Sequence, residues 1–553
     1  MKKALSLILA LILVMALFAG CAPADDESSK PAESGKPAES SKPVESEEED
    51  DGLDEYGLYP VGTYPISPEV IEMHGARPQN GRTAWNDNMQ RQWMLEMTNI
   101  DLTMDEYPGD VWIEKQGVML AGGTYPEFFY MANCGKDTQI LYGLDGGYLL
   151  DLKPYIEAGN MPNFKAIADG DERVYKVFGL EGGESLYALP WLANGLYEPT
   201  FGINKVWMET VGMPDMPQTL DELNALFQAI IDEDANQNGD PADEIPMSSC
   251  YSFYWLPMYV NFGITTDGIW EAESEGSGIA SYAALTQNYR DYVIWLADCY
   301  EKGYLDARTP GCVINDEAIV ADMLSNKIGI GYMASYGGWG QDLGAQLQAF
   351  IPVSYNGQDP VWFDAPVGVE GTMTVTDACT NVEALLRYID FYYGEEGATQ
   401  FSYGKEGYSY LMKDDGTWET IFDENEYENW TEFQNTFSIQ GNFYWPNAYN
   451  PAWDAADARA AQSNVVKGRQ ALLPYARASF PPVTLTTDQS EEISVISTDL
   501  ANWKDTQIVE FVIGKQDPTD DAQWQAFMDG FYARGIETYI EVYQEALDAY
   551  YGK

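Results

Sequence analysis

Apolar residues recur at helical spacing in several stretches of the chain. Residues 219–231 have this period, and Thr219 and Glu222 form a capping box at its start. Residues 383–393 and 522–550 show the same period, with a predicted break at Gly535. Short apolar runs at 111–113 and 327–333 predict β-strands. This alternation of strands and helices predicts α/β lobes with largely parallel sheets.

The first twenty residues predict an export signal. Lys2 and Lys3 precede an apolar stretch at 5–18, which is too short to span a bilayer comfortably, and Cys21 follows. The segment resembles a bacterial lipoprotein signal, although Phe18 stands where Leu is usual. An ordinary secretory signal with a chance cysteine is the alternative. We expect Cys21 to be lipidated with more than one acyl chain, which anchors the chain stably at the extracellular face of a bacterial membrane.

Residues 21–55 predict a disordered tether. A Lys-Pro-Ala/Val-Glu-Ser unit recurs three times with a period of six, and an acidic run follows at 47–51. Such a segment has almost nothing to bury and repels itself, so it stays extended. The whole chain carries −58; the tether has thirteen acids and three lysines and the signal two lysines, which leaves −50 for residues 56–553. The acidity therefore belongs mainly to the folded body.

Composition excludes several classes of function. With 88 Asp and Glu against 30 Lys and Arg, a nucleic-acid partner is disfavoured. The single histidine, His74, excludes multi-histidine zinc sites, and we expect it to be a surface or structural residue. An odd number of further cysteines, with no close pair, excludes a disulfide scaffold. They are Cys134, Cys250, Cys299, Cys312 and Cys379. Tyr and Trp, at 38 and 16, outnumber the 21 Phe, which suits wet clefts.

Residues 234–244 predict a loop that binds a hard, oxygen-seeking cation. Its oxygen donors stand at the spacing of a calcium loop, with Gly239 at the sharp turn. The candidate ligands are Asp234, Asn236, Asn238, Asp240, Asp243 and Glu244. Ile245 occupies the place where a full EF-hand has its bidentate Glu, so the loop is abbreviated. We expect a structural Ca²⁺ rather than a catalytic metal; the alternative is a polar turn that caps a helix.

Five segments in order carry a resemblance to a known family. They are MLAGGTYPE at 119–127, GGYLLDLKPYI at 146–156, YALPW at 187–191, the stretch 202–222 with the calcium-like loop behind it, and RYIDFYYGEEG at 387–397 with GKEGY at 404–408. From about residue 75 to the end, the body resembles the family 1 extracellular solute-binding proteins, the receptor lipoproteins of ABC importers. It is most similar to the large LipO-type lipoproteins of Gram-positive bacteria.

The resemblance implies a two-lobed periplasmic-binding-protein type II fold with a hinge and an interlobe ligand cleft. We place the first part of lobe 1 at 56–190, lobe 2 at 191–325, a return to lobe 1 at 326–375, and a largely helical part completing the lobes at 376–553. The resemblance also implies a monomer that performs no chemistry and delivers its ligand to the transmembrane subunits of an ABC permease.

A neutral sugar or oligosaccharide is the ligand class that the chemistry favours. The acidic body disfavours anionic solutes, and amphipathic aromatic rings stack on the apolar faces of sugars. The family's ligand loops follow strands and lobe crossings. Mapping them onto this chain gives Trp85, Asp87, Tyr125, Glu127, Trp191, Tyr254, Trp255, Trp339, Trp362 and Trp445.

Two other classes of function stay open. A surface-anchored glycoside hydrolase needs two carboxylates at a set separation, and no segment marks such a pair. A peptide-binding receptor lipoprotein would use backbone contacts in a larger cleft.

Overall fold

The structure is a computed structural model of residues 1–553. The residues it describes are 52–79, 84–180, 182–193, 201–249, 258–272, 276–312, 316–332, 339–364, 367–422, 426, 430–438, 445–483 and 485–553. The export signal, Cys21 and the tether up to residue 51 lie outside them. Residues 52–553 form one compact unit.

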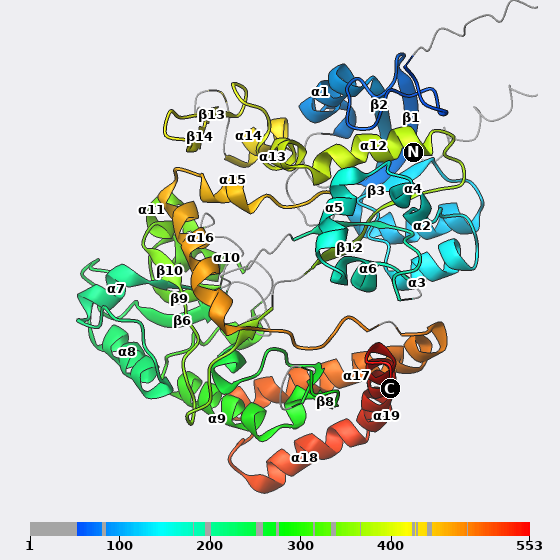
Figure 1. The fold of residues 1–553 in the computed structure, drawn as a ribbon. Helices are drawn as coiled ribbons and strands as arrows, with labels where there is room; N and C mark the ends of the chain where they lie inside the picture. Colours follow the sequence, from blue (N-terminus) through cyan, green and yellow to red (C-terminus); the bar gives the residue numbers. More distant parts are fainter. Residues whose placement is uncertain are drawn as a thin grey trace, which may run out of the picture. The chain divides into compact units, whose positions relative to one another are not determined.

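A five-stranded sheet forms the centre of the first lobe (Figure 1). Its strand order is β2 (Ile100–Tyr107), β1 (Ile71–Pro78), β3 (Phe128–Tyr130), β12 (Gly368–Val375) and β4 (Leu189–Leu192). β1 runs parallel to β2 and β3, whereas β12 runs antiparallel to β3 and β4. Alternate residues of β2, at 100, 102 and 104, are buried in the core, as expected when one face of a strand packs inward.

Helices bury their apolar faces against this sheet. They are α1 (Met89–Thr98), α2 (Trp112–Ala121), α4 (Lys153–Glu157), α5 (Pro162–Gly170), α6 (Arg173–Phe178), α12 (Val382–Asp390) and α13 (Glu395–Tyr403). α3 (Lys136–Gln139) follows β3. A hairpin of β13 (Tyr410–Met412) and β14 (Trp418–Thr420) and the helix α14 (Trp430–Phe437) extend this lobe, where Trp93 of α1 stacks on Phe437.

A four-stranded sheet forms the centre of the second lobe. Its order is β10 (Leu347–Ala349), β5 (Phe201–Asn204), β9 (Ile328–Tyr332) and β6 (Ile245–Ser249). The helices of this lobe are α7 (Lys205–Thr210), α8 (Leu220–Asp232), α9 (Gln287–Glu301), α10 (Glu317–Leu324), α11 (Gln341–Gly344) and α16 (Ala460–Leu472). Thr219 caps α8 by accepting the N–H of Glu222, which confirms the predicted start of that helix.

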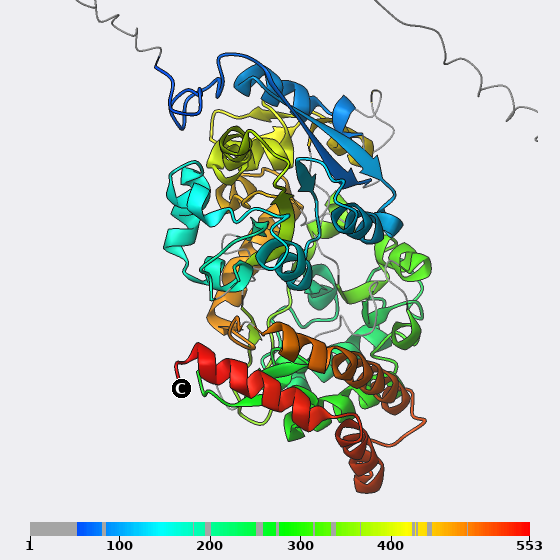
Figure 2. The same ribbon diagram turned by 90° about the vertical axis from the view of Figure 1, so that its right-hand side faces the viewer.

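The C-terminal helices join the core of the second lobe. They are α17 (Thr487–Val512), α18 (Asp521–Tyr532) and α19 (Ile536–Tyr550), and they group beside α9 and the hairpin of β7 (Ile269–Glu271) and β8 (Ala280–Tyr282) (Figures 1 and 2). Gly535 has a φ of 84° and separates α18 from α19, so the predicted break is confirmed. No helix among the described residues is long and apolar enough to cross a membrane.

Two expectations from the sequence differ from the structure. Residues 111–113 do not form a strand: Trp112 begins α2, where Trp112, Gln116 and Leu120 are buried at helical spacing. The run at 327–333 does contain a strand, but β9 pairs with β5 and β6 of the second sheet. The chain therefore returns to the first sheet only at β12 rather than at residue 326.

Asp390 ties two helices of the first lobe together. Its carboxylate accepts the backbone N–H groups of Asn163, at 3.1 Å, and Phe164, at 2.9 Å, in the first turn of α5. These N–H groups have no partner within their own helix. Asp390 is only 4% exposed, and burial raises its pKa to about 6, although the hydrogen bonds oppose the shift.

Asp390→Asn is expected to flatten the pH dependence of stability. The folded state holds the Asp390 proton more tightly than the unfolded chain, whose carboxyl has a pKa of about 4. The wild-type protein therefore gains roughly 2–3 kcal/mol from this group as the pH falls from about 7 to about 4. Urea unfolding at both pH values measures the effect, with Asp110→Asn, an exposed carboxylate of the same lobe, as control. Equal pH dependence in wild type and Asp390→Asn would contradict this assignment.

Candidate ligand site

In the first sheet, the carboxyl ends of four strands meet at one edge. β1, β2 and β3 are parallel, and β4 has the same direction because both β3 and β4 run antiparallel to β12. Pro78, Tyr107, Tyr130 and Leu192 therefore end their strands at the edge where β12 begins. Open α/β sheets bind their ligands outside such an edge.

A buried cation organises this edge. Arg77, at the end of β1, is 2% exposed, and its Nε lies 3.0 Å from Oε1 of Glu106. The guanidinium carbon lies 4.7 Å from the centroid of the Trp445 ring, a cation–π contact. Burial lowers the pKa of Arg77, and Glu106 opposes that shift. The face of Trp445 is thus occupied by Arg77.

Two passages of the chain lie side by side where β4 leaves the first sheet. Leu192 donates its N–H to the carbonyl of Asn447 at 2.8 Å, and Tyr449 donates to the carbonyl of Leu192 at 2.9 Å. Trp191 of β4 pairs with Val369 of β12 and packs in a small cluster with Ala193, Val369 and Tyr449. Trp191 is therefore located where the chain passes from the first sheet towards the second.

A charged pair connects this crossing to the second lobe. Arg469 lies on α16, which packs against β10, and its Nη1 donates to the Tyr449 hydroxyl at 2.8 Å. Arg469 also forms an ion pair with Asp454, whose side chain is 2% exposed, on α15 (Pro451–Ala455). Burial raises the pKa of Asp454, while Arg469 and Tyr449 oppose the shift. A desolvated carboxylate thus depends on one guanidinium at the crossing.

The second sheet presents a corresponding edge. β6 and β10 run in the direction of β9, since β6 pairs parallel with β9 and both β10 and β9 pair antiparallel with β5. At the end of β6, Ser248 donates to Asp306 at 2.8 Å, and Arg308 pairs with Asp306 at 2.7 Å. Burial alone would raise the pKa of Asp306, but the hydrogen bonds from Arg308 and Ser248 outweigh it and lower that pKa.

Three of the aromatic residues proposed from the sequence lie in the hydrophobic core. Trp85 and Trp362 are each 1% exposed and Trp445 is fully buried. The Trp85 indole N–H donates to the carbonyl of Leu102 at 2.7 Å, which fixes the ring beneath β2. A ring covered on all sides offers no face to a ligand, so these three are removed from the candidate site.

Tyr125 and Glu127 lie at the opposite edge of the first sheet. The turn that contains them follows α2 and precedes β3, which places both at the amino end of that strand. The Tyr125 hydroxyl donates to Asp377 at 2.6 Å, and Glu127 accepts the N–H of His74 at 2.8 Å. These two residues therefore have structural partners away from the carboxyl edge.

The other proposed residues remain predictions from the sequence. Asp87 is exposed in the short helix Trp85–Asp87 that follows β1. Trp191 is 7% exposed. Trp339 is 3% exposed in the apolar cluster with Ile319 and Leu347, so its ring is covered as the three core rings are. Tyr254 and Trp255 lie outside the described residues. Sequence reasoning missed Arg77, Tyr449, Asp454 and Arg469, because no local pattern shows that a charged residue will be buried.

The loop at 234–244 folds around its own polar side chains. Asp234 accepts the N–H groups of Asn238 and Gly239, and the side chains of Asn236 and Asn238 both donate to Asp243. Lys327, directly before β9, has its Nζ 3.0 Å from Oδ2 of Asp243. The side chains that the sequence proposed as ligands are thus gathered in one loop.

The donor chemistry of this loop fits an oxygen-seeking cation. Oε2 of Glu244 is buried without a hydrogen-bond partner among the described residues, and burial raises the pKa of Glu244, with Asp243 and Asp234 adding to the shift. The described residues contain no cluster of three His, Cys, Asp or Glu arranged to hold a metal. A complete coordination shell for a cation in this loop would therefore need the side-chain oxygens of Asn236 and Asn238 and a backbone carbonyl as well.

A curated relative aligns along most of the chain, although no family model matches the sequence. The fructooligosaccharide ABC transporter substrate-binding protein FusA of Streptococcus pneumoniae is 22% identical over 503 residues, which cover 84% of this chain and 87% of FusA. This chain is a homologue of ABC-transporter substrate-binding proteins. Lipoprotein LipO of Bacillus subtilis is 22% identical over 142 residues, or 26% of each protein.

Solved structures of solute-binding proteins share the two-lobed fold. FusA in complex with kestose superposes with a TM-score of 0.67 at 18% identity, covering 87% of this chain and 100% of that one. An HMO binding, ABC-transporter associated solute-binding protein from Bifidobacterium longum infantis gives a TM-score of 0.70 at 18% identity, covering 88% and 99%. A FusA EF-hand mutant has also been solved, in complex with fructo-nystose (TM-score 0.66, 18% identity, covering 87% and 100%).

Arg469→Met is expected to destabilise the protein by about 3–5 kcal/mol near neutral pH, because Asp454 is left as an unpaired buried carboxylate. Without Arg469 the pKa of Asp454 rises further, so the folded state takes up a proton and the loss shrinks as the pH falls. Chemical unfolding of Arg469→Met and of Arg469→Met with Asp454→Asn measures the coupling. The double variant should recover more than half of the loss; equal losses would show that the pair is not coupled.

Proposed function

We propose that this chain is the substrate-binding lipoprotein of an ABC importer and captures a neutral sugar or oligosaccharide by closure of its lobes. The observation that carries the proposal is the alignment with FusA over most of both chains, together with the shared two-lobed fold. FusA was solved with kestose, and the Bifidobacterium homologue is described as HMO binding. The net charge of −50 on residues 56–553 favours a neutral ligand over an anion.

The proposed ligand site lies between the carboxyl edges of the two sheets. In it we place Asp87 and Trp191 from the first lobe. Trp339, Tyr254 and Trp255 stay candidates that rest on the sequence alone. Trp191 is central to the proposal because it lies against Tyr449 at the crossing, where a change in lobe angle alters the packing around its ring. Ligand binding then shifts the population towards the closed arrangement. The ligand leaves unchanged, so no residue has a catalytic role.

Neutral oligosaccharides are expected to raise the melting temperature, whereas peptides do not. Trp191→Ala should weaken oligosaccharide binding about tenfold, because a stacking face is lost at the crossing. Isothermal titration calorimetry measures the affinity, and Trp503→Ala, a partly buried Trp on α17, is the control. Unchanged affinity in Trp191→Ala would remove this residue from the site. Release of shorter products from labelled oligosaccharide would contradict binding without chemistry.

We further propose that the protein is held at the extracellular face of the membrane through lipid on Cys21. The export signal, the extended acidic tether and the relationship to LipO support this anchoring. The transmembrane subunits of the permease are the proposed protein partners, and the receptor itself is proposed to be a monomer.

The loop at 234–244 is proposed to hold a structural Ca²⁺. Asp234, Asn236 and Asn238 would supply side-chain oxygens, Asp240 its carbonyl, and Asp243 or Glu244 the closing carboxylate. The unpartnered Oε2 of Glu244 supports this assignment, as does the existence of an EF-hand in FusA. When bound, the cation would offset the repulsion among the carboxylates of Asp234, Asp243 and Glu244.

Calcium is expected to raise the melting temperature by about 1 °C for each kcal/mol of binding free energy, and EDTA to reverse the shift. Asp234→Asn and Glu244→Gln should abolish the response, since each removes a charged oxygen donor. Asp232→Asn, which makes the same change just before the loop, is the matched control and should respond as wild type does. An undiminished calcium response in Asp234→Asn would show that the cation binds elsewhere.

A further inference from the structure

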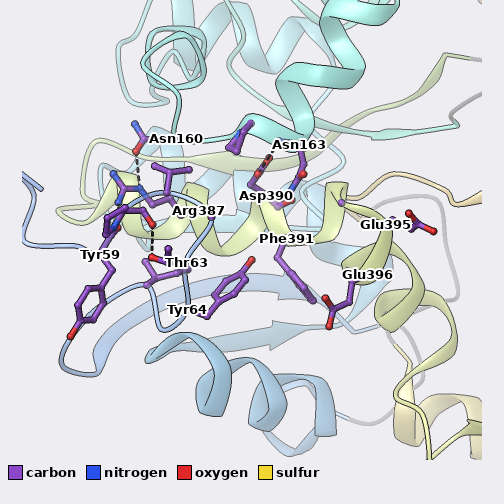
Figure 3. Close-up of a pocket in the computed structure, with 17 residues that line it drawn as sticks. Tyr59, Thr63, Tyr64, Asn160, Asn163, Arg387, Asp390, Phe391, Glu395 and Glu396 are labelled. Carbon is purple, nitrogen blue, oxygen red and sulfur yellow. Dashed lines mark hydrogen bonds between the residues drawn. The ribbon is translucent and has the colours of Figure 1, made fainter. Parts of the chain in front are cut away.

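A second pocket lies in the first lobe, at the opposite edge from the proposed ligand site. It has a volume of about 310 Å³ and is enclosed by residues 59–66, the start of α5, and the junction of α12 with α13 (Figure 3). Ile66 donates its N–H to the carbonyl of Thr98 at 2.9 Å, directly before β2 begins. The wall formed by residues 59–66 is therefore located at the amino ends of the strands.

Arg387 fixes this wall in place. Its side chain is 6% exposed, and it pairs with Asp54 at 2.6 Å. It also donates to the carbonyl of Tyr59 at 3.0 Å and to the side chain of Asn160 at 2.9 Å. All three guanidinium nitrogens are thus committed to oxygens of the protein. The pocket is pre-formed, and its one lining cation is already neutralised.

Two aromatic rings form a corner inside the pocket. Tyr64 and Phe391 have ring centroids 6.0 Å apart and planes at 87° to one another. Tyr64 remains 43% exposed, so part of its ring is open to a ligand, whereas Phe391 is 5% exposed and holds the corner against the core. In this edge-to-face pair the edge of one ring meets the face of the other. The exposed part of the Tyr64 ring is the surface on which a cation can lie.

Carboxylates lie beside this aromatic corner. Burial raises the pKa of Tyr64 to about 12, and the charges of Asp390 and Glu396 add to the shift, which places both acids near its hydroxyl. The Asp390 carboxylate is already hydrogen-bonded to α5. Glu396 has no hydrogen bond or ion pair with any described residue, and Figure 3 shows it beside the Phe391 ring, while Glu395 points away. The corner therefore has a free negative charge and no competing lysine among the residues that line it.

We propose that this pocket binds a small alkylammonium ion, with the cation against the exposed ring of Tyr64, which Phe391 holds in place, and with Glu396 as its counter-charge. A quaternary or alkylated ammonium has an apolar, weakly hydrated surface that suits ring faces, and its charge requires the carboxylate. The site is independent of the proposed oligosaccharide site, since it uses no residue of the carboxyl edge.

Titration calorimetry with choline and with its neutral isostere 3,3-dimethylbutan-1-ol tests the proposal. The two probes have nearly the same shape, so a preference for choline of about tenfold or more reports the charge. Glu396→Gln should weaken choline binding about tenfold, and Tyr64→Leu, which keeps an apolar side chain without a ring, should weaken it by a similar factor. Glu395→Gln, on the same helical turn, is the matched control and should change the affinity less than about twofold.

Choline binding is also expected to persist in Trp191→Ala and in the presence of saturating oligosaccharide, which separates this proposal from the proposed function. Because Tyr64→Leu can disturb the fold, its melting temperature is compared with that of wild type. If the two melting temperatures differ, Glu396→Gln becomes the deciding variant. Absence of saturable choline binding would overturn the proposal. Equal binding of choline and the alcohol, or an unchanged affinity in Glu396→Gln, would overturn it as well.

Discussion

The chain crosses between the two lobes more than once. Backbone hydrogen bonds between Leu192 and residues 447–449 hold two of these crossing segments side by side. A third passage runs from β10 to β12, and β11 (Trp362–Phe363) pairs along it with β15 (Ala476–Arg477). Backbone bonds of this kind constrain direction and spacing but permit small rotations of φ and ψ, which suits a hinge. The position of Trp191, the partners of Tyr449 and the link made by Arg469 all follow from this alignment.

Arginine is scarce in this acidic chain, and several arginines serve structural positions. Arg77, Arg387 and Arg469 each lie largely buried beside a carboxylate. Arg77, through Trp445, and Arg387, through Asp54, join segments that are far apart in the sequence, whereas Arg469 joins neighbouring segments. Pairs of this kind add little net stability compared with an apolar replacement, but the loss of one partner is strongly destabilising because the other is left desolvated. They therefore specify which segments meet. Since so few cations remain for the surface, most acids there are uncompensated, and the field around the body is negative.

The sequence predicted the α/β architecture, α8 with its cap, the break at Gly535 and the strand β9, because each has a local pattern of apolar spacing or turn chemistry. It misread residues 111–113, since Val-Trp-Ile has strand propensity and only the burial of Gln116 and Leu120 shows the helical face. For the site, residue type was a poor guide. A tryptophan side chain suits a hydrophobic core as well as a ligand cleft. Trp85, Trp362 and Trp445 lie in the core, and only tertiary packing distinguishes that location from a cleft.

The abbreviated loop at 234–244 has a structural reason in the element that follows it. An EF-hand loop leads into a helix, whose first turn carries the bidentate glutamate. Here the loop leads into β6, and Ile245 pairs with Ile328 of β9 and donates its N–H to the carbonyl of Lys327. Its side chain packs against the cluster around Ile319 and Trp339, so a carboxylate at this position would be desolvated among apolar groups. The closing ligand of the proposed calcium shell therefore has to come from before the strand, where Asp243 and Glu244 lie, and their adjacency to β6 couples the loop to the second sheet.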